Sequence, residues 1–423
     1  MYRGLRTLSY GAEDHRLEEW LIALSRHPAV DPYLVAAAAF GRMAETGVGA
    51  LDHCHVTQDP SRLFEEAVAV SRAAKDVGLH VAFAVPFGGR NPLVYGDPAD
   101  LLASLPEPDR AMARAQIDSL RLSASVPDRM ARLETLEHAF FHLQLGPIAP
   151  QWVPEPVLAE IADLSARTGR RVHMHLLETS RQREWADATY GKGGLVGYLD
   201  RIGLLSPRLS VAHAVWLDPS DCALLAERGV TVSINLSSNM RLRSGAPPLA
   251  MMRAAGLRFA IGLDGMSFDD DEDMLREARL LWRLHDGVGQ PPLPTSELLD
   301  ALCRTGREAI VGDTAGGRIV CGAPADLLAI DLSRIVHDRI GAFPLMPLFL
   351  SRVTRSHVDA LWVNGRRAVE RGRCLGIDLP AIEDALLAEA RAAARIDDAA
   401  VERIDRLQQA VQAHYESHGH CEC

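Results

Sequence analysis

Short apolar runs alternate with stretches of helical pattern over most of the chain, and this alternation restricts the fold more than any other feature. Seven runs have the length and composition of buried strands: 48–53, 80–86, 140–145, 171–177, 209–213, 230–234 and 258–263. Strand-then-helix units at this spacing predict a parallel sheet with right-handed crossovers. The expected fold class is α/β, of the (β/α)8 TIM-barrel type, although a closed barrel has eight strands.

The pattern changes after about residue 320. Short strands are expected at 325–331, 360–364 and 367–370, and Asn364-Gly365 is a strong signal for a two-residue hairpin turn. The sequence therefore predicts a barrel over 1–320, a small β module over 321–378, and a C-terminal helix and tail over 379–423. Within the barrel, the Pro-, Asp- and Arg-rich segment 88–133 is typical of an insertion loop with a helix inside it, which could cover the site.

Charge and composition exclude several classes of partner and location. The 423 residues carry a net charge of −11 without a basic stripe, which argues against nucleic acid and anionic membranes. No apolar run approaches the roughly 18 residues of a membrane span, and the first residues have no apolar signal core. Seven scattered cysteines indicate reduced thiols. We expect a cytoplasmic protein.

Polar groups stand where a buried strand would not need them. His175 and Glu178 close the run 171–177, His213 ends the next run, and Asp264 follows the last. All strand ends of a barrel open on one face, so these groups should converge. Two imidazoles and a carboxylate form a familiar site for zinc or a similar cation. Core histidines satisfied by hydrogen bonds are the alternative, but four such groups at strand ends favour a metal site.

These positions carry motifs that resemble the amidohydrolase superfamily, in its cytosine-deaminase-like and atrazine-hydrolase-like branch. The resemblance covers essentially the whole chain. The matching segments are His175-Leu-Leu-Glu178, Val211-Ala-His213, Gly262-Leu-Asp264-Gly265, Ser233 to Asn239, Gly245-Ala-Pro-Pro, Gly146 to Pro150, and Val363-Asn-Gly365 followed by Val369-x-x-Gly372.

The resemblance implies a set of roles. His175, His213 and Asp264 would bind one divalent metal, zinc or iron, which lowers the pKa of bound water from 15.7 to about 7. Glu178 would act as general acid/base, and Asp264 would also orient or deprotonate the water. The substrate would be a small heterocyclic molecule, and family habit suggests a homodimer. The expected substrate-binding residues are Ile148, Gln151, Trp152, Ile234, Asn235 and Asn239.

The sequence departs from the family in its first strand, which in the family ends in a His-x-His metal-binding pair. The start of this chain resembles the stretch just after that pair, and the front half of the β-sandwich is missing too. The expected fold is therefore a barrel lacking its first strand with a partial C-terminal β-sandwich, from either a truncated or a degenerate member. His53 and His55 have the right spacing and could rescue the site or contact substrate. His173 is expected to support the site or to pack.

The interpretation leaves three functions open. The first is hydrolysis of a C–N bond with release of ammonia from a ring amidine. The second is displacement of an alkylamine or halide from a heteroaromatic ring, or cleavage of a cyclic amide. The third is a catalytically inactive binding barrel without full metal ligation. Ile148 and Ile234 stand where purine deaminases often have histidines, which weighs against adenosine-like and guanine-like substrates.

Two further polar segments have plainer explanations than metal binding. The acidic run 269–273 is better explained as helix N-terminal carboxylates. The tail 417–423, which contains His and Cys, is expected to be a frayed terminus.

Overall fold

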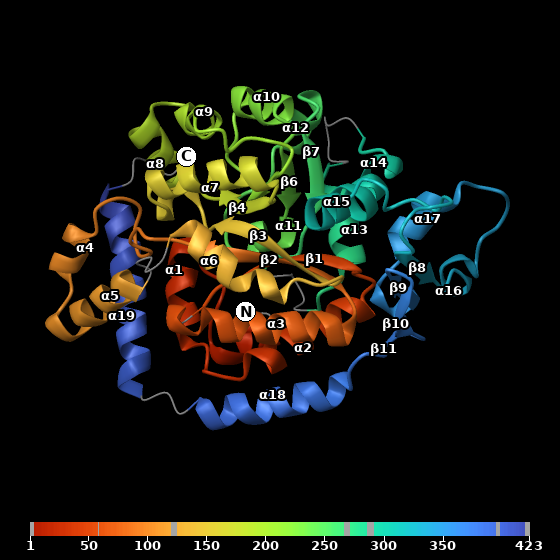
Figure 1. Ribbon diagram of the computed structural model, residues 1–423, viewed down its shortest axis with the longest axis horizontal. Helices are drawn as coiled ribbons and strands as arrows, with labels where there is room; N and C mark the ends of the chain where they lie inside the picture. The colour runs from red at the N-terminus through yellow and green to blue at the C-terminus, as the bar shows by residue number, and fades with distance from the viewer. Residues whose placement is uncertain are drawn as a thin grey trace.

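The computed structural model describes residues 4–57, 59–119, 125–265, 271–285, 292–394 and 398–418. Seven parallel strands form one sheet, and their order in the sheet is their order in the chain (Figure 1). The strands are β1 (Ala50–Cys54), β2 (His80–Phe87), β3 (Phe141–Pro147), β4 (Val172–Leu176), β5 (Leu209–His213), β6 (Thr231–Ile234) and β7 (Arg258–Ile261). The predicted α/β class and all seven predicted strands are confirmed.

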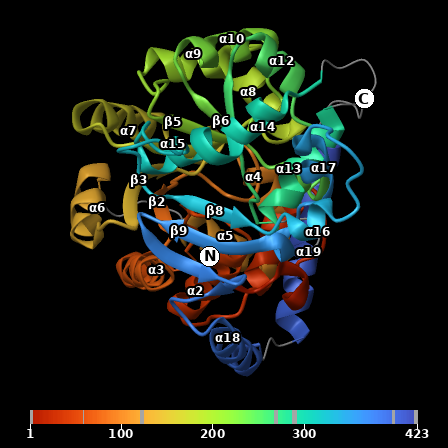
Figure 2. The ribbon, with the colours of Figure 1, turned by 90° about the vertical axis from the view of Figure 1, so that its right-hand side faces the viewer.

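The sheet curls like part of a barrel but does not close. Among the described residues, β1 pairs only with β2 and β7 pairs only with β6, so both outer strands keep a free edge. Helices cover the outer face of the sheet (Figure 2). The helices of the first half are α1 (Leu17–Ala23), α2 (Pro32–Glu45), α3 (Leu63–Val77), α4 (Ala99–Ser104), α5 (Glu107–Ser119), α6 (Val126–Leu133), α7 (Glu155–Thr168), α8 (Ser180–Tyr190) and α9 (Gly194–Arg201).

The remaining helices follow β5 and the strands after it. They are α10 (Pro219–Glu227), α11 (Leu236–Arg241), α12 (Leu249–Ala254), α13 (Met274–His285), α14 (Thr295–Asp300), α15 (Gly306–Val311), α16 (Ser333–Val336), α17 (Leu345–Arg352), α18 (Leu379–Ala393) and α19 (Asp398–His418). None of the helices in the described ranges is both long and apolar enough to cross a membrane.

Side-chain alternation in β4 decides which groups reach the interior of the sheet. Val172, Met174 and Leu176 belong to the main core cluster, whereas His173 and His175 face the opposite side. The same alternation operates in the other strands. A parallel strand covered on both faces is normally apolar throughout, so the two imidazoles mark the inner face as functional.

The insertion between β2 and β3 is more helical than the sequence predicted. One helix was expected there, but the described part of 88–133 contains α4, α5 and α6. A proline stands at or next to the start of each, at Pro98, Pro108 and Pro127, where its fixed φ suits the first turn. The prolines that suggested a loop therefore begin helices.

The C-terminal strands form a separate antiparallel sheet, with the order β11-β10-β9-β8. They are β8 (Leu327–Ile330), β9 (Val358–Val363), β10 (Arg366–Glu370) and β11 (Arg373–Cys374). The predicted hairpin is confirmed, since Asn364 and Gly365 both have positive φ, at 50° and 75°. Apolar residues of β9 and β10 join the main core cluster, so this sheet shares a core with the barrel. The boundaries proposed at 320 and 378 stay predictions.

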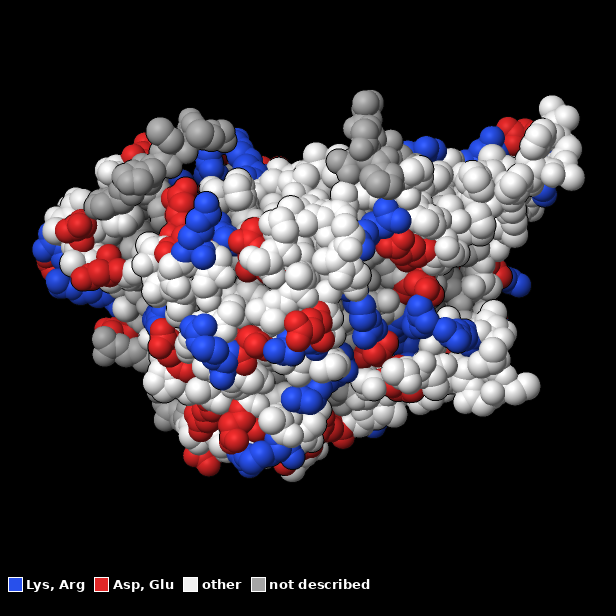
Figure 3. Space-filling model, turned by 90° about the horizontal axis from the view of Figure 1, so that it is seen from above, with Lys and Arg blue, Asp and Glu red and all other residues white. Residues whose placement is uncertain are grey.

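The last two helices run back along the barrel. In Figure 1, α18 lies below α2 and α19 lies beside α1, α4 and α5. A second apolar cluster joins α1, α4, α5 and α19 through residues such as Leu101, Ala113 and Leu407. On the face shown in Figure 3, basic and acidic side chains are interspersed, without a basic stripe.

Candidate active site

A cavity of about 720 Å³ opens at the carboxyl ends of the parallel strands. Its lining includes His175, Glu178, His213 and Asp264, which are the four polar groups that the sequence singled out. The cavity also continues between the two free sheet edges, where residues of β1 and β7 line it. The fold thus brings to one place groups that lie up to 89 residues apart, counted from 175 to 264.

Hydrogen bonds orient the two imidazoles in the same way. His175 Nδ1 lies 2.7 Å from the carbonyl oxygen of Ile148, and His213 Nδ1 lies 2.7 Å from Asn239 Oδ1. Both partners are acceptors, so each ring donates from Nδ1 and keeps a lone pair on Nε2. The rings are stacked, with their centroids 5.4 Å apart. Burial lowers the pKa of both histidines, which favours the neutral form that binds a cation.

Glu178 is a buried carboxyl group close to His213. It is only 2% exposed, and its Oε2 lies 3.5 Å from His213 Nε2. Burial, followed by repulsion from Asp264, raises the pKa of Glu178 to about 8. Its backbone N–H donates to Gln182 Oε1 at 2.7 Å, and Ser244 Oγ donates to its carboxylate at 3.3 Å. A carboxyl with this pKa can give and take a proton near neutral pH.

Three of these strand ends have an unusual backbone. Leu177, His213 and Asp264 have φ values of 46°, 71° and 53°, in the left-handed region that non-glycine residues seldom adopt. Each such residue costs of order 1–3 kcal/mol, and such strain is often found at functional sites. Asp264 Oδ2 also accepts a hydrogen bond of 2.5 Å from Ser238 Oγ. The local conformation therefore serves the placement of these side chains rather than stability.

The donor set fits a divalent cation. Two neutral imidazoles with available Nε2 atoms and the Asp264 carboxylate line one cavity, and these are ligand types that zinc accepts. The ligand atoms of His175, His213 and Asp264 do not all lie within 4.8 Å of one another, however. Among the described residues, the only His, Cys, Asp or Glu set whose ligand atoms all lie within 4.8 Å of one another is Asp52, Cys54 and His173.

A model of the amidohydrolase family matches residues 6–368 of the sequence. The chain belongs to the amidohydrolase family. It is similar to a 5'-deoxyadenosine deaminase of Methanosarcina barkeri, with 31% identity over 55% of this chain and 53% of that protein. It is also similar to a 5-methylthioadenosine/S-adenosylhomocysteine deaminase of Dictyoglomus thermophilum, with 30% identity over 57% and 56%. The chain spans about half the length of these curated relatives.

Solved structures agree with the family assignment at the level of the fold. A zinc-bound adenosine deaminase from Xanthomonas campestris superposes with a TM-score of 0.72 and 22% identity, covering 96% of this chain and 83% of that one. A zinc complex of atrazine chlorohydrolase from Arthrobacter aurescens gives a TM-score of 0.70 and 21% identity, covering 93% and 85%. The predicted resemblance to amidohydrolases is confirmed.

The structure divides the predicted substrate-binding residues of this amidohydrolase into two groups. Ile148, Trp152 and Asn235 line the cavity. Ile234 does not: it is fully buried in the core cluster, because its neighbours Ser233 and Asn235 take the inner face of β6. The described lining of the cavity also lacks two other predicted residues, Gln151 and Asn239. Both are almost completely buried, and Asn239 holds His213.

His53 and His55 contact groups on the β1 side of the sheet rather than His175 and His213. His53 pairs with Phe83 in the β1–β2 register, stacks on its ring and meets Phe40 of α2 edge-on. His55 is fully buried, and its Nε2 lies 2.7 Å from a carboxylate oxygen of Glu66 in α3. His53 also lines the cavity at the edge of β1, whereas His55 does not appear in its described lining, so a role for the pair at the site stays a prediction.

Glu18 is a buried carboxylate near the site that was not among the predicted site residues. Thr179 Oγ1 and Tyr95 Oη donate to Glu18 Oε1 at 2.7 and 2.8 Å, and Arg181 pairs with Glu18 at 3.1 Å. The Tyr95 backbone N–H donates to Tyr415 Oη of α19 at 3.0 Å. The signal was present, since Glu18 and Glu19 precede Trp20 within an apolar helix. Glu18 lies in a helix, so motifs at strand ends do not identify it.

The two polar segments with plainer explanations are only partly visible. Within the acidic run, Asp273 Oδ1 accepts from the backbone N–H groups of Leu275 and Arg276 at the start of α13, as expected for a helix N-terminus. Positions 269 and 270 lie outside the described residues. The tail from 419 to 423 does as well.

Proposed function

We propose that this chain carries the catalytic groups of a metal-dependent hydrolase that releases ammonia from a heterocyclic amidine. One observation carries the proposal: the buried carboxyl of Glu178 lies 3.5 Å from Nε2 of His213, whose Nδ1 is hydrogen-bonded to Asn239. That arrangement places an acid beside a possible cation ligand in one cavity. The names of the related deaminases support the same reaction type.

His175, His213 and Asp264 would hold one divalent cation, zinc or iron, which would activate water for attack on the ring carbon. Glu178 would give a proton to the departing nitrogen, because its raised pKa keeps it protonated near neutral pH. Asp264 would accept the proton of the attacking water. Its bond from Ser238 fixes the carboxylate in one orientation for that task.

For the substrate, we propose an adenine nucleoside with an apolar 5′ group. The relatives are named for 5'-deoxyadenosine, 5-methylthioadenosine and S-adenosylhomocysteine, which all carry an amidine in the adenine ring, and the first two have an apolar 5′ end. The cavity offers Ile148 and Trp152 as apolar walls. Ile148 and Ile234 were the two residues that weighed against a purine substrate. Ile234 faces the core instead of the cavity, so only Ile148 still does.

Ammonia release from 5′-deoxyadenosine by zinc-loaded protein tests the proposal. The wild type should turn over, and Glu178→Gln should lose roughly 10²–10⁴-fold in kcat, the usual share of a general acid. Glu184→Gln, an exposed carboxylate on the same helix as Gln182, is the matched control and should keep its activity. His213→Ala should lose the cation held with His175 and Asp264.

Other products would identify another reaction. Chloride or alkylamine release from a triazine, without ammonia from nucleosides, would favour the displacement reaction. Neither product from metal-loaded protein would favour a binding barrel. The nature of the cation, a cytoplasmic location and a homodimer are parts of the proposal that rest on the sequence.

A further inference from the structure

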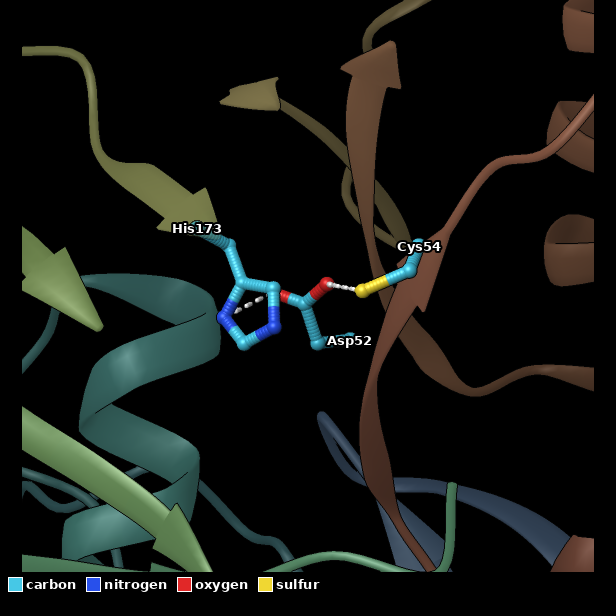
Figure 4. A group of neighbouring side chains, drawn as sticks. All are labelled: Asp52, Cys54 and His173. Atoms are coloured by element: carbon cyan, nitrogen blue, oxygen red, sulfur yellow. Dashed lines mark hydrogen bonds and ion pairs between the residues drawn. The ribbon is translucent and has the colours of Figure 1, made fainter. Parts of the chain in front are cut away.

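Three side chains that take no part in the proposed reaction meet inside the half-barrel. Asp52 and Cys54 are two residues apart on β1 and therefore share one face of the strand, and His173 reaches toward them from β4 (Figure 4). Cys54 Sγ lies 3.8 Å from Asp52 Oδ1, and His173 Nδ1 lies 3.8 Å from Asp52 Oδ2. All three line the cavity of the active site.

We propose that Asp52, Cys54 and His173 form a second cation site, separate from the one assigned to His175, His213 and Asp264. The chemical class of the cation is a borderline divalent metal such as zinc or cobalt, because thiolate, imidazole and carboxylate are together the ligands that such ions take. The inference does not depend on the deaminase reaction.

The spacing of the ligand atoms is close to what a tetrahedral ion needs. Zinc binds sulfur at roughly 2.3 Å and nitrogen or oxygen at roughly 2.0–2.2 Å, so neighbouring donor atoms in a tetrahedron lie about 3.4–3.5 Å apart. Cys54 Sγ and His173 Nδ1 each lie 3.8 Å from a different oxygen of Asp52, and one ligand atom from each of the three residues lies within 4.8 Å of the other two. Rotation of these side chains toward one another would complete three corners. The fourth corner would belong to a water or ligand in the cavity.

The surroundings of the cluster favour a cation over an empty arrangement. No lysine or arginine forms a close ion pair with Asp52 in the described parts of the chain: Cys54 and His173 contact it, and Arg171 acts on it only from a longer distance. A carboxylate inside a protein is normally compensated by a positive charge. Ser210 Oγ lies 2.8 Å from His173 Nδ1 and donates to the carbonyl oxygen of Val172 at 3.4 Å, so Nδ1 donates to Ser210 and Nε2 keeps the lone pair for a cation. A bound cation would displace the Cys54 thiol proton and add positive charge beside Asp52.

The second site would lie beside the first. His173 and His175 occupy the same face of β4, with ring centroids 6.4 Å apart, and His173 comes earlier in the strand. Since active-site groups gather at the carboxyl ends of the strands, the Asp52–Cys54–His173 site lies one step deeper in the half-barrel. The two sites share no ligand, so each can be removed without touching the other.

Cobalt substitution of the full chain gives a direct test. A thiolate bound to Co²⁺ produces a charge-transfer absorption in the near ultraviolet, which nitrogen and oxygen ligands alone do not. The wild type should show this band. Cys54→Ser should lose the band and about one bound cation per chain. Cys222→Ser, which changes a buried cysteine of α10, should keep both.

Three further results separate the explanations. His213→Ala should keep the charge-transfer band, and a wild type that shows the band but releases no ammonia would uphold this inference and count only against the proposed function. A band that survives in Cys54→Ser but disappears in the double variant Cys421→Ser/Cys423→Ser would place the thiolate in the tail and overturn the inference. Absence of the band from folded wild-type protein at saturating Co²⁺ would overturn it too.

Discussion

Asn239 provides the sharpest test of how the site is organised, because the sequence predicts a substrate contact and the structure shows a support for His213. Its Oδ1 accepts from His213 Nδ1 at 2.7 Å. Asn239 and His213 are 0% and 1% exposed, so water cannot take over the bond after a mutation. Asn239→Ala should therefore leave a buried N–H without a partner and free the imidazole to rotate or change tautomer.

The expected loss follows from two independent estimates. A buried donor without a partner costs about 1–3 kcal/mol. Removal of a group that orients a metal-binding histidine typically costs 10–100-fold in metal affinity, which is about 1.4–2.7 kcal/mol. Both estimates place the dissociation constant for zinc in Asn239→Ala roughly 10–100-fold above the wild-type value. Competition with a chelator measures it without any need for turnover.

Two further variants make the measurement specific. Asn239→Asp can only accept at this position, so it should retain most of the metal affinity if His213 donates from Nδ1. Ser237→Ala removes a buried hydroxyl of the same helix that does not contact His213 in the described structure, and it should bind zinc normally. Unchanged zinc affinity in Asn239→Ala, with a raised KM for the nucleoside, would refute the reasoning and restore Asn239 as a substrate contact.

Three other changes have defined outcomes. Because burial raises the pKa of Glu178 to about 8, the rate should fall as pH rises through that value. The contribution of Glu178 to stability is complete below its ordinary pKa of 4.5 and should decline from there up to about pH 8, which a pH series of melting curves would measure. Glu18→Gln removes a charge that raises this pKa, so the alkaline limb of the rate profile should move to lower pH; an unmoved limb would contradict the assignment. Leu407→Ala, at a fully buried position of α19, should cost about 2–4 kcal/mol in unfolding free energy by denaturant titration, against about 0.5 kcal/mol or less for the exposed Gln409→Ala.

Much of the barrel was predictable because its signals are local. A buried strand needs a run of apolar residues, and the run at 171–177 differs from β4 by one residue at each end. Helix α8 was not predicted, since its mean composition is polar and its start depends on a cap, Thr179 Oγ1 accepting from Gln182 N. The insertion was misread for a related reason: proline marks the first turn of a helix as readily as a loop.

The candidate site was predictable in its strand-end groups but not in its supports. A histidine at the end of an apolar run is visible in the sequence, as His213 is. The bond that fixes its tautomer comes from a residue 26 positions away, whose side chain could equally have faced the cavity. For Ile234, the sequence predicted the strand but placed the side chain on the cavity face, whereas it lies in the core. Successive residues of a strand face opposite sides of the sheet, so an error of one residue moves a side chain from the cavity to the core.

The same parity explains the three residues His53, Cys54 and His55. Their spacing suggests two ligands, because a histidine pair at i and i+2 shares a face of a strand. Which face they share depends on the register of β1 against β2, where His53 pairs with Phe83 and Cys54 pairs with Ala84. Phe83 is packed into the helix-covered core, so the histidines follow it and the cysteine faces inward. Cys54, which lies between the two histidines, therefore faces the interior of the half-barrel together with Asp52. These two residues, and not the histidine pair, lie near His173.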